Sequence, residues 1–107
     1  MIRSAEPKDV TSILQLIKGL AEYERDLEAV INTEEKLHND LFVSKLCEAF
    51  VAEEDAIVIG FSLFFTAYST WKGPVIYLED LFVLPEHRKT GAGSKLFDAV
   101  VQIAKDR

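Results

Sequence analysis

Residues 81–94 read Leu81-Phe82-Val83-Leu84-Pro85-Glu86-His87-Arg88-Lys89-Thr90-Gly91-Ala92-Gly93-Ser94, and this stretch carries the strongest structural signal in the chain. An apolar run stops at Pro85, and a stripe of helical spacing begins at Gly93, so the stretch predicts a strand, a loop and a helix. Glycines let a backbone approach a ligand closely, and N–H groups at a helix start attract anions. With Arg88 and Lys89 beside them, these features predict an anion site, while the glycines alone fit a tight turn with close helix–sheet packing equally well.

Two familiar phosphate motifs are excluded by spacing. The segment Gly91-Ala92-Gly93-Ser94-Lys95 lacks the four-residue gap and the Lys-Ser/Thr order of a Walker A loop. The dinucleotide fingerprint needs a third glycine and a parallel sheet, and neither is predicted here.

The segments before the loop predict a mostly antiparallel sheet. Residues 50–53, 57–68 and 75–84 are rich in β-branched and aromatic side chains, and turns only a few residues long separate them. Residues 2–4 form a further candidate strand. Short connections join antiparallel neighbours, so we expect the last three strands to form a meander.

Helical spacing appears in three places. Apolar residues recur on one face from Val10 to Ala21 after Pro7, and a shorter helix is predicted from Thr33. The last helix should run from about Gly91 to the end of the sequence. Its expected apolar stripe consists of Gly93, Leu96, Phe97, Val100, Val101 and Ala104. The predicted order is β-α-α-β-β-β-α, an α/β (α+β) fold in a single domain spanning residues 1–107.

Composition narrows the function. Hydrophobic residues make up 49% and charged residues 28% of the 107, which favours one globular domain over disorder. The net charge of −6 argues against nucleic acid and acidic membranes as partners and favours a cationic one. No signal-like or membrane-length apolar run is present, so we expect a cytoplasmic protein. A lone Cys47 excludes an internal disulfide, and with His38 and His87 lacking ligand spacing we expect no metal.

The pattern Arg88-x-x-Gly91-x-Gly93 after Leu81-Phe82-Val83 resembles the acetyl-CoA signature of the GNAT superfamily of N-acetyltransferases. Residues 77–83, Gly93-Ser94, residues 20–24 and Trp71-x-Gly73 are similar to the spermidine/spermine (diamine) and thialysine N-acetyltransferases. The resemblance covers nearly the whole chain and about the first two-thirds of the family domain.

The resemblance implies a cofactor site on the strand and loop. The strand backbone would follow the pantetheine arm of acetyl-CoA, with one N–H polarising the thioester carbonyl, and the loop would wrap the pyrophosphate. Lys89 stands where these relatives usually carry glycine, so its side chain should point outward. The implied cofactor residues are Leu81, Phe82, Val83, Arg88, Lys89, Thr90, Gly91, Ala92, Gly93 and Ser94.

The resemblance also implies an acceptor site. Glu79 would anchor the amine or act as its base, and Asp80 would assist, although strand alternation places the two on opposite faces. Tyr23 and Glu24 match a substrate-contacting pair, and Trp71 would offer an apolar or cation–π wall. The expected reaction is direct acetyl transfer to a primary amine of a polyamine or thialysine-like acceptor, in a ternary complex.

A second hypothesis is a catalytically weak CoA-binding or interaction module. The later strands of the family domain, and a tyrosine that protonates the departing thiolate, have no counterpart among residues 1–107; Tyr23, Tyr68 and Tyr77 do not match it. An open sheet edge would expose backbone groups, so we expect a homodimer or a complementing chain to cover it.

Overall fold

Short turns join the last three strands, so strands adjacent in sequence are also adjacent in the sheet. The computed structural model describes residues 1–107, and its strand order is β1-β2-β3-β4 with every neighbouring pair antiparallel. The strands are β1 (Ile2–Ser4), β2 (Glu48–Glu54), β3 (Ile57–Ser69) and β4 (Gly73–Val83). The predicted sheet is confirmed, and β4 lies at its edge.

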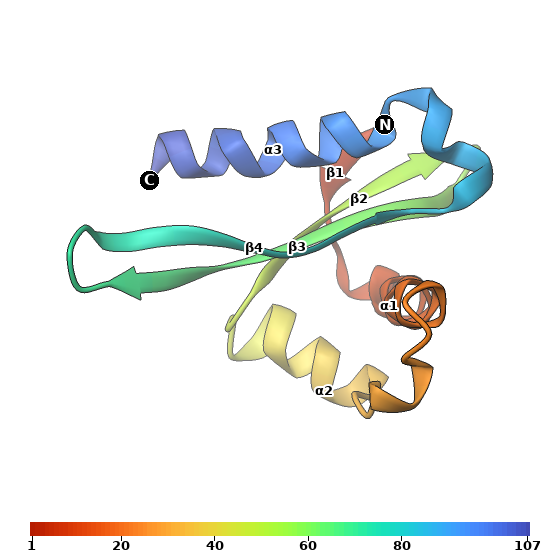
Figure 1. Cartoon of the computed structure of the whole chain (residues 1–107), viewed down its shortest axis with the longest axis horizontal. Helices are drawn as coiled ribbons and strands as arrows, with labels where there is room; N and C mark the ends of the chain where they lie inside the picture. The colour runs from red at the N-terminus through yellow and green to blue at the C-terminus, as the bar shows by residue number, and fades with distance from the viewer.

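Helices cover both faces of the sheet (Figure 1). The C-terminal helix α3 (Ala92–Asp106) lies on one face, and α1 (Val10–Tyr23) and α2 (Glu34–His38) lie on the other. Thr33 caps the start of α2, near the predicted position, because its hydroxyl accepts the Lys36 N–H at 3.1 Å. A π-helical turn (Asn39–Val43) extends α2, and short 3-10 turns occupy Pro7–Asp9, Leu27–Ala29 and Pro85–Thr90. No helix has the length and apolarity that crossing a bilayer requires.

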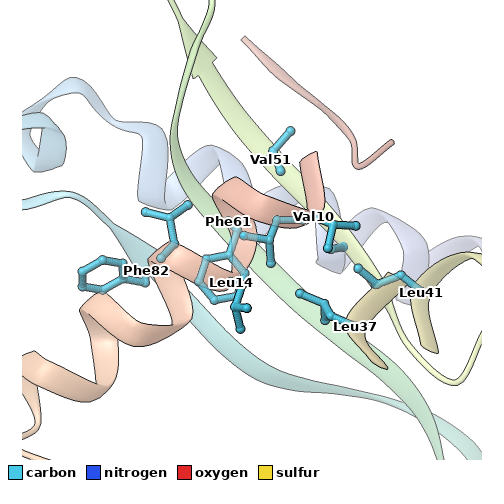
Figure 2. Packing of buried hydrophobic residues seen from close by; sticks show 10 residues of the cluster. Val10, Leu14, Leu37, Leu41, Val51, Phe61 and Phe82 are labelled. Carbon is cyan, nitrogen blue, oxygen red and sulfur yellow. The ribbon is translucent and has the colours of Figure 1, made fainter. Parts of the chain in front are cut away.

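The sheet divides the core into two clusters. On the α1 and α2 face, Phe61 and Phe82 pack with Leu14 and neighbouring aliphatic side chains (Figure 2). On the α3 face, Val83 packs against Leu96, which is completely buried. Full burial of one such side chain contributes about 1.5–3 kcal/mol, so the strand that carries Phe82 and Val83 is held from both faces.

An ion-pair cluster joins the start of the chain to β2. The Arg3 guanidinium donates to both carboxylate oxygens of Asp9, at 2.7 and 3.0 Å, and to Glu53 at 2.8 Å. Burial by itself would raise the pKa of Asp9, but the bonds from Arg3 and from the Glu6 amide outweigh it and lower the pKa. These charges satisfy one another within the fold.

The structure corrects two details of the sequence prediction. β4 begins at Gly73, two residues before its predicted start, because Pro74 pairs with Tyr68. Proline is tolerated there because β4 is an edge strand, and no further strand lies on its outer side to accept a hydrogen bond from an N–H group. Phe97 was expected on the buried stripe of α3 but is 50% exposed. The buried positions are Ala92, Leu96 and Val100, an i, i+4 row, so one narrow ridge of the helix contacts the sheet.

A β-bulge interrupts β4 at Glu79. Asp80 pairs with Leu63 and Leu78 pairs with Phe64, which leaves Glu79 as an extra residue without a partner on β3. Bulges redirect side chains and are common beside active sites. The expectation that Glu79 and Asp80 lie on opposite faces assumed regular alternation, and alternation is broken at this residue.

Gly60 allows β3 and β4 to approach closely where β4 ends. It pairs with Val83, and a Cβ at Gly60 would lie 2.9 Å from the Phe82 carbonyl oxygen and 3.0 Å from Val83 Cγ2. The first contact is with backbone, which cannot rotate away. The position of residues 82–83 therefore depends on a glycine in the neighbouring strand.

Gly60→Ala is expected to lower the free energy of unfolding by about 2 kcal/mol, the usual cost of an overpacked core site. Urea denaturation monitored by circular dichroism measures it. Gly19→Ala is the matched control, because its Cβ would meet only the ring of Phe82, at 3.4 Å, and alanine favours the helix. Equal stability of Gly60→Ala and wild type would show that the strands can separate without cost.

Candidate active site

The outer edge of β4 presents backbone groups that no neighbouring strand pairs with, next to the loop. The Leu84 N–H donates to the Ile59 carbonyl at 2.9 Å, so these residues form a hydrogen-bonded pair. Such pairs alternate with non-bonded pairs in an antiparallel ladder. The next pairs are Val83 with Gly60, Phe82 with Phe61 and Leu81 with Ser62. The backbone N–H and C=O groups of Leu81 and Val83 therefore face the open edge, while those of Phe82 bind β3.

The turn after β4 ends in a left-handed glycine. Gly91 has φ +82° and ψ 5°, and its carbonyl accepts the first bond of α3 from the Lys95 N–H at 3.1 Å. Only glycine adopts this conformation without strain. No side chain caps α3, so the N–H groups of its first turn are left for another partner. This arrangement is a helix start suited to an anion.

Internal bonds shape the loop before Gly91. The Thr90 hydroxyl donates to the His87 carbonyl at 2.7 Å, and His87 Nδ1 lies 3.2 Å from a carboxylate oxygen of Glu54. Arg88 Nε donates to the Val83 carbonyl at 3.0 Å. No carboxylate lies within 4.0 Å of the charged groups of Arg88 or Lys89. The loop therefore offers two cationic groups that the acidic chain does not neutralise.

Gly93 distinguishes between the two explanations for the glycines of the loop, an anion site and a tight turn with close helix–sheet packing. Its φ is not positive, and a Cβ there would meet only Leu81 Cδ2 and Val83 Cγ2, both at the ordinary contact distance of 3.9 Å. Neither backbone strain nor packing requires glycine here, yet glycine in a helix costs about 1 kcal/mol relative to alanine. The remaining reason is close approach of a group from outside the chain, which favours the anion site over the packing turn at this position.

A cavity of about 340 Å³ brings the loop, the strand and α1 together. Its lining residues are Leu20, Tyr23, Leu81, Phe82, Val83, Arg88 and Gly93. Of the four larger hollows, one of about 400 Å³ is lined mainly by acidic residues around Arg25, and those of about 590, 520 and 410 Å³ lie beside Arg3 and Arg107. The arginines there are already bound to carboxylates, Arg3 to Asp9 and Arg107 to Glu48. The smaller cavity is where unpaired donors and free strand edge converge.

Carboxylates gather beside this cavity. Asp80 lies two residues before Phe82 and so shares its face, the face that α1 covers. Burial raises the pKa of the Asp80 carboxyl, and the carboxylates of Glu79 and Glu24 raise it further. Glu79 is exposed on the bulge. The three acidic groups therefore lie close enough to repel one another.

The structure brings six of the predicted site residues together around one cavity, which is lined by Tyr23, Leu81, Phe82, Val83, Arg88 and Gly93. Glu24 and Asp80 adjoin lining residues, and the charge of Glu24 raises the pKa of Asp80. Lys89, Thr90 and Gly91 are exposed on the loop, whereas Ala92 is buried in the core on the α3 side. Trp71 lies apart from the cavity, at the tip of the β3–β4 hairpin, and is 94% exposed. A strand rises about 3.3 Å per residue, so this tip lies roughly 20 Å from Asp80.

Sequence reasoning missed three features of the site. The bulge at Glu79 leaves no local sequence signal, because it arises from pairing with β3. Leu20 lines the cavity, though its helical spacing indicated only core packing. Gly60 could have been found, since an isolated glycine inside a β-branched run often marks close backbone approach.

The profile of the Acetyltransferase (GNAT) family matches residues 11–107, nearly all of the chain. The chain belongs to the GNAT acetyltransferase family. It is 40% identical over 116 aligned residues to the thialysine N-ε-acetyltransferase of Bos taurus, covering 100% of this chain and 68% of that protein. It is also 33% identical over 111 residues to the human spermidine/spermine N(1)-acetyltransferase-like protein 1, covering 96% of this chain and 16% of that one.

Solved GNAT structures have the same architecture. An aminoglycoside N-acetyltransferase in complex with CoA superposes with a TM-score of 0.69 and 26% identity, covering 99% of this chain and 71% of that one. The family and this neighbour support acetyl-CoA as the cosubstrate, and the chain is an acetyltransferase. The residues present fit that group, because Gly93 leaves open the space that a Cβ would fill beside uncapped N–H groups and unpaired cations. The four-stranded sheet lacks the C-terminal strands of a complete GNAT domain.

Proposed function

We propose that this chain transfers the acetyl group of acetyl-CoA to a primary amine of a small cationic acceptor, a polyamine or a thialysine-like amino acid. The observation that carries the proposal is the carboxylate cluster of Glu24, Glu79 and Asp80 beside the cavity that Gly93 lines. An anion site and a cation site adjoin on one strand, which is the arrangement that a polyanionic donor and a cationic acceptor require. The thialysine and spermidine/spermine relatives are named after amine acceptors, which agrees with a cluster of carboxylates at the acceptor side.

Acetyl-CoA supplies an activated acetyl thioester, and the chain supplies position and charge. The first turn of α3 and the two loop cations would hold the pyrophosphate. The Leu81 N–H at the open edge would donate to the thioester carbonyl and stabilise negative charge on its oxygen. Glu79 would accept the ammonium proton, directly or through water, so that the free amine attacks the carbonyl carbon. The C–S bond of the tetrahedral intermediate then breaks, and CoA leaves as a thiolate that takes up the second proton lost by the amine nitrogen, giving the amide and free thiol. Asp80 and Glu24 would bind the remaining positive charge of the acceptor.

The direct test is acetyl-CoA turnover with a panel of amines. Spermidine, putrescine and thialysine are each mixed with acetyl-CoA and the 107-residue chain, and free thiol is followed with a colorimetric reagent while product mass is read by mass spectrometry. Thiol release that requires an amine, together with a product gaining one acetyl group, is the expected result. Binding of acetyl-CoA without transfer to any amine would favour the second hypothesis, a CoA-binding module that needs another chain.

Cation binding is expected to strengthen as pH rises through the raised pKa of Asp80. The carboxyl is neutral below that pKa, which lies above the ordinary aspartate value of about 3.9. A bound cation favours the carboxylate, so binding lowers the pKa and releases a proton. Calorimetric titration of spermidine across acidic pH measures the slope. Asp80→Asn should flatten it, and an unchanged slope in that variant would assign the proton to another group.

A further inference from the structure

The Arg88 side chain connects the cofactor loop to the end of α1. Its guanidinium carbon lies 5.1 Å from the centroid of the Tyr23 ring and 5.5 Å from that of Phe82. Both distances fall within the range of a cation–π contact. The Nε–H group is fixed on the Val83 carbonyl at 3.0 Å, so the plane of the side chain is anchored at the strand edge. One residue of the loop therefore contacts both β4 and α1 across the cavity.

The partners of Arg88 differ from those of Arg3 and Arg107. Arg3 binds the carboxylates of Asp9 and Glu53, and Arg107 binds Glu48. Arg88 has no carboxylate partner in a chain with 18 acidic residues and instead uses a carbonyl and two ring faces. Its position is thus set by the Val83 carbonyl, Tyr23 and Phe82 rather than by an ion pair.

The two rings that Arg88 contacts differ in how firmly the rest of the fold holds them. Phe82 is 5% exposed and held in the core, whereas Tyr23 is 67% exposed at the last residue of α1. A contact with a buried ring orients the arginine, and a contact with an exposed ring orients the ring as well. Tyr23 adjoins Glu24, whose carboxylate belongs to the acidic cluster around Asp80.

We propose that Arg88 is a positioning residue for the acceptor side of the site: by stacking on Tyr23 it fixes the end of α1, and with it Tyr23 and Glu24, relative to the cofactor loop. This rests on the proposed function for the identity of the acceptor side. The contact makes the two halves of the site energetically dependent on each other, and such dependence is reciprocal. Arg88 thus affects acceptor binding through Tyr23, separately from any contact with phosphate.

A double-mutant cycle measures the contact itself. The variants are Tyr23→Leu, Arg88→Gln and the double mutant, with unfolding equilibria measured in urea. An exposed cation–π contact corresponds to a coupling of about two- to fivefold in the equilibrium constant. Tyr23→Phe keeps the ring face and should retain the coupling. Tyr68→Leu removes an exposed tyrosine in β3, far from Arg88 along the hairpin, and should give none. Additive effects of the first pair would overturn the proposal.

Steady-state kinetics distinguish a positioning role of Arg88 from a role in binding phosphate. At saturating acetyl-CoA, Arg88→Gln should raise the KM for the amine about two- to fivefold, the same factor as the coupling, with a smaller effect on kcat. Lys89→Gln removes the same charge from the same loop, but Lys89 makes no cation–π contact with Tyr23, so in this variant only the affinity for acetyl-CoA should fall. In the Tyr23→Leu background, Arg88→Gln should no longer change the KM for the amine.

The outcomes distinguish this proposal from the proposed function. If wild type binds neither acetyl-CoA nor amines, the proposed function fails and the positioning role fails with it. A second outcome is that the wild type acetylates amines, but Arg88→Gln raises the KM for the amine by the same factor in the wild type and in the Tyr23→Leu variant. That result would overturn only the positioning role. Coupling in both the unfolding equilibria and the amine KM supports it.

Discussion

Glu79→Gln is expected to lower kcat for acetyl transfer about 100-fold, the scale of a lost general base. The amide keeps the size and shape of the side chain but cannot accept a proton at neutral pH. Glu79 is exposed on the β4 bulge and makes no ladder pair, so its replacement should leave the fold and the loop unchanged. Single-turnover kinetics with spermidine or thialysine measure the chemical step, and calorimetry with acetyl-CoA measures cofactor binding.

Asp80→Asn is the matched control for Glu79→Gln. Asp80 is half-buried among carboxylates, and we assign it to holding the cation. Its amide variant should therefore raise the KM for the amine more than it lowers kcat. The assignment of roles is wrong if Asp80→Asn lowers kcat 100-fold while Glu79→Gln changes only KM. Loss of acetyl-CoA binding in Glu79→Gln would mean that the bulge supports the cofactor loop.

Gly93→Ala is expected to weaken acetyl-CoA binding roughly 100-fold while the protein becomes no less stable. A methyl group beside the first turn of α3 would keep the pyrophosphate from the N–H groups; losing two charge-assisted hydrogen bonds of about 1.5 kcal/mol each gives this factor. Inside the protein the same methyl makes only contacts at 3.9 Å. Alanine also favours the helix by about 1 kcal/mol, so the midpoint of thermal unfolding should rise or stay constant.

The Gly93→Ala experiment is specific because acetyl-CoA affinity is expected to fall while the stability of the fold is expected to rise or stay constant. Gly19→Ala, the other helical glycine substitution, should gain the same helix preference without weakening acetyl-CoA binding. Gly91→Ala is a poorer probe, since φ +82° makes any side chain there costly whatever the ligand does. Unchanged acetyl-CoA affinity in Gly93→Ala would remove the argument that this glycine makes room for phosphate.

Local patterns in the sequence were enough to predict the element order and the loop. Helical spacing from Val10 to Ala21 and the β-branched run after Ile57 each identify an element from its own residues, and Pro85 marks the end of β4. The Arg88–Gly93 spacing pointed to acetyl-CoA through its likeness to the GNAT signature, and membership of the family is now shown.

Pairing between distant segments was not predictable in the same way. The bulge at Glu79 depends on how β3 and β4 align, and the contact of Arg88 with Tyr23 depends on where α1 ends against the sheet. The half-exposed Phe97 reflects how narrow the contact between α3 and the sheet is, which helical periodicity does not reveal. Trp71 matched the relatives by local sequence, and its distance from Asp80 follows from the length of the hairpin.

The extra residue at Glu79 also puts the two halves of β4 out of phase. From the hairpin to Leu78 the strand follows one alternation of faces, and from Asp80 to Val83 it follows another, offset by one residue. Removing Glu79 itself would bring the halves into phase without turning either of them, because Leu78 and Asp80 already pair with the adjacent residues Phe64 and Leu63. Phe82 would still face α1 and Val83 would still face α3. Deletion of Glu79 should therefore be tolerated, as should length changes at the tip near Trp71, whereas an insertion between Leu81 and Val83 should be rejected; a library of such length variants would reveal this pattern.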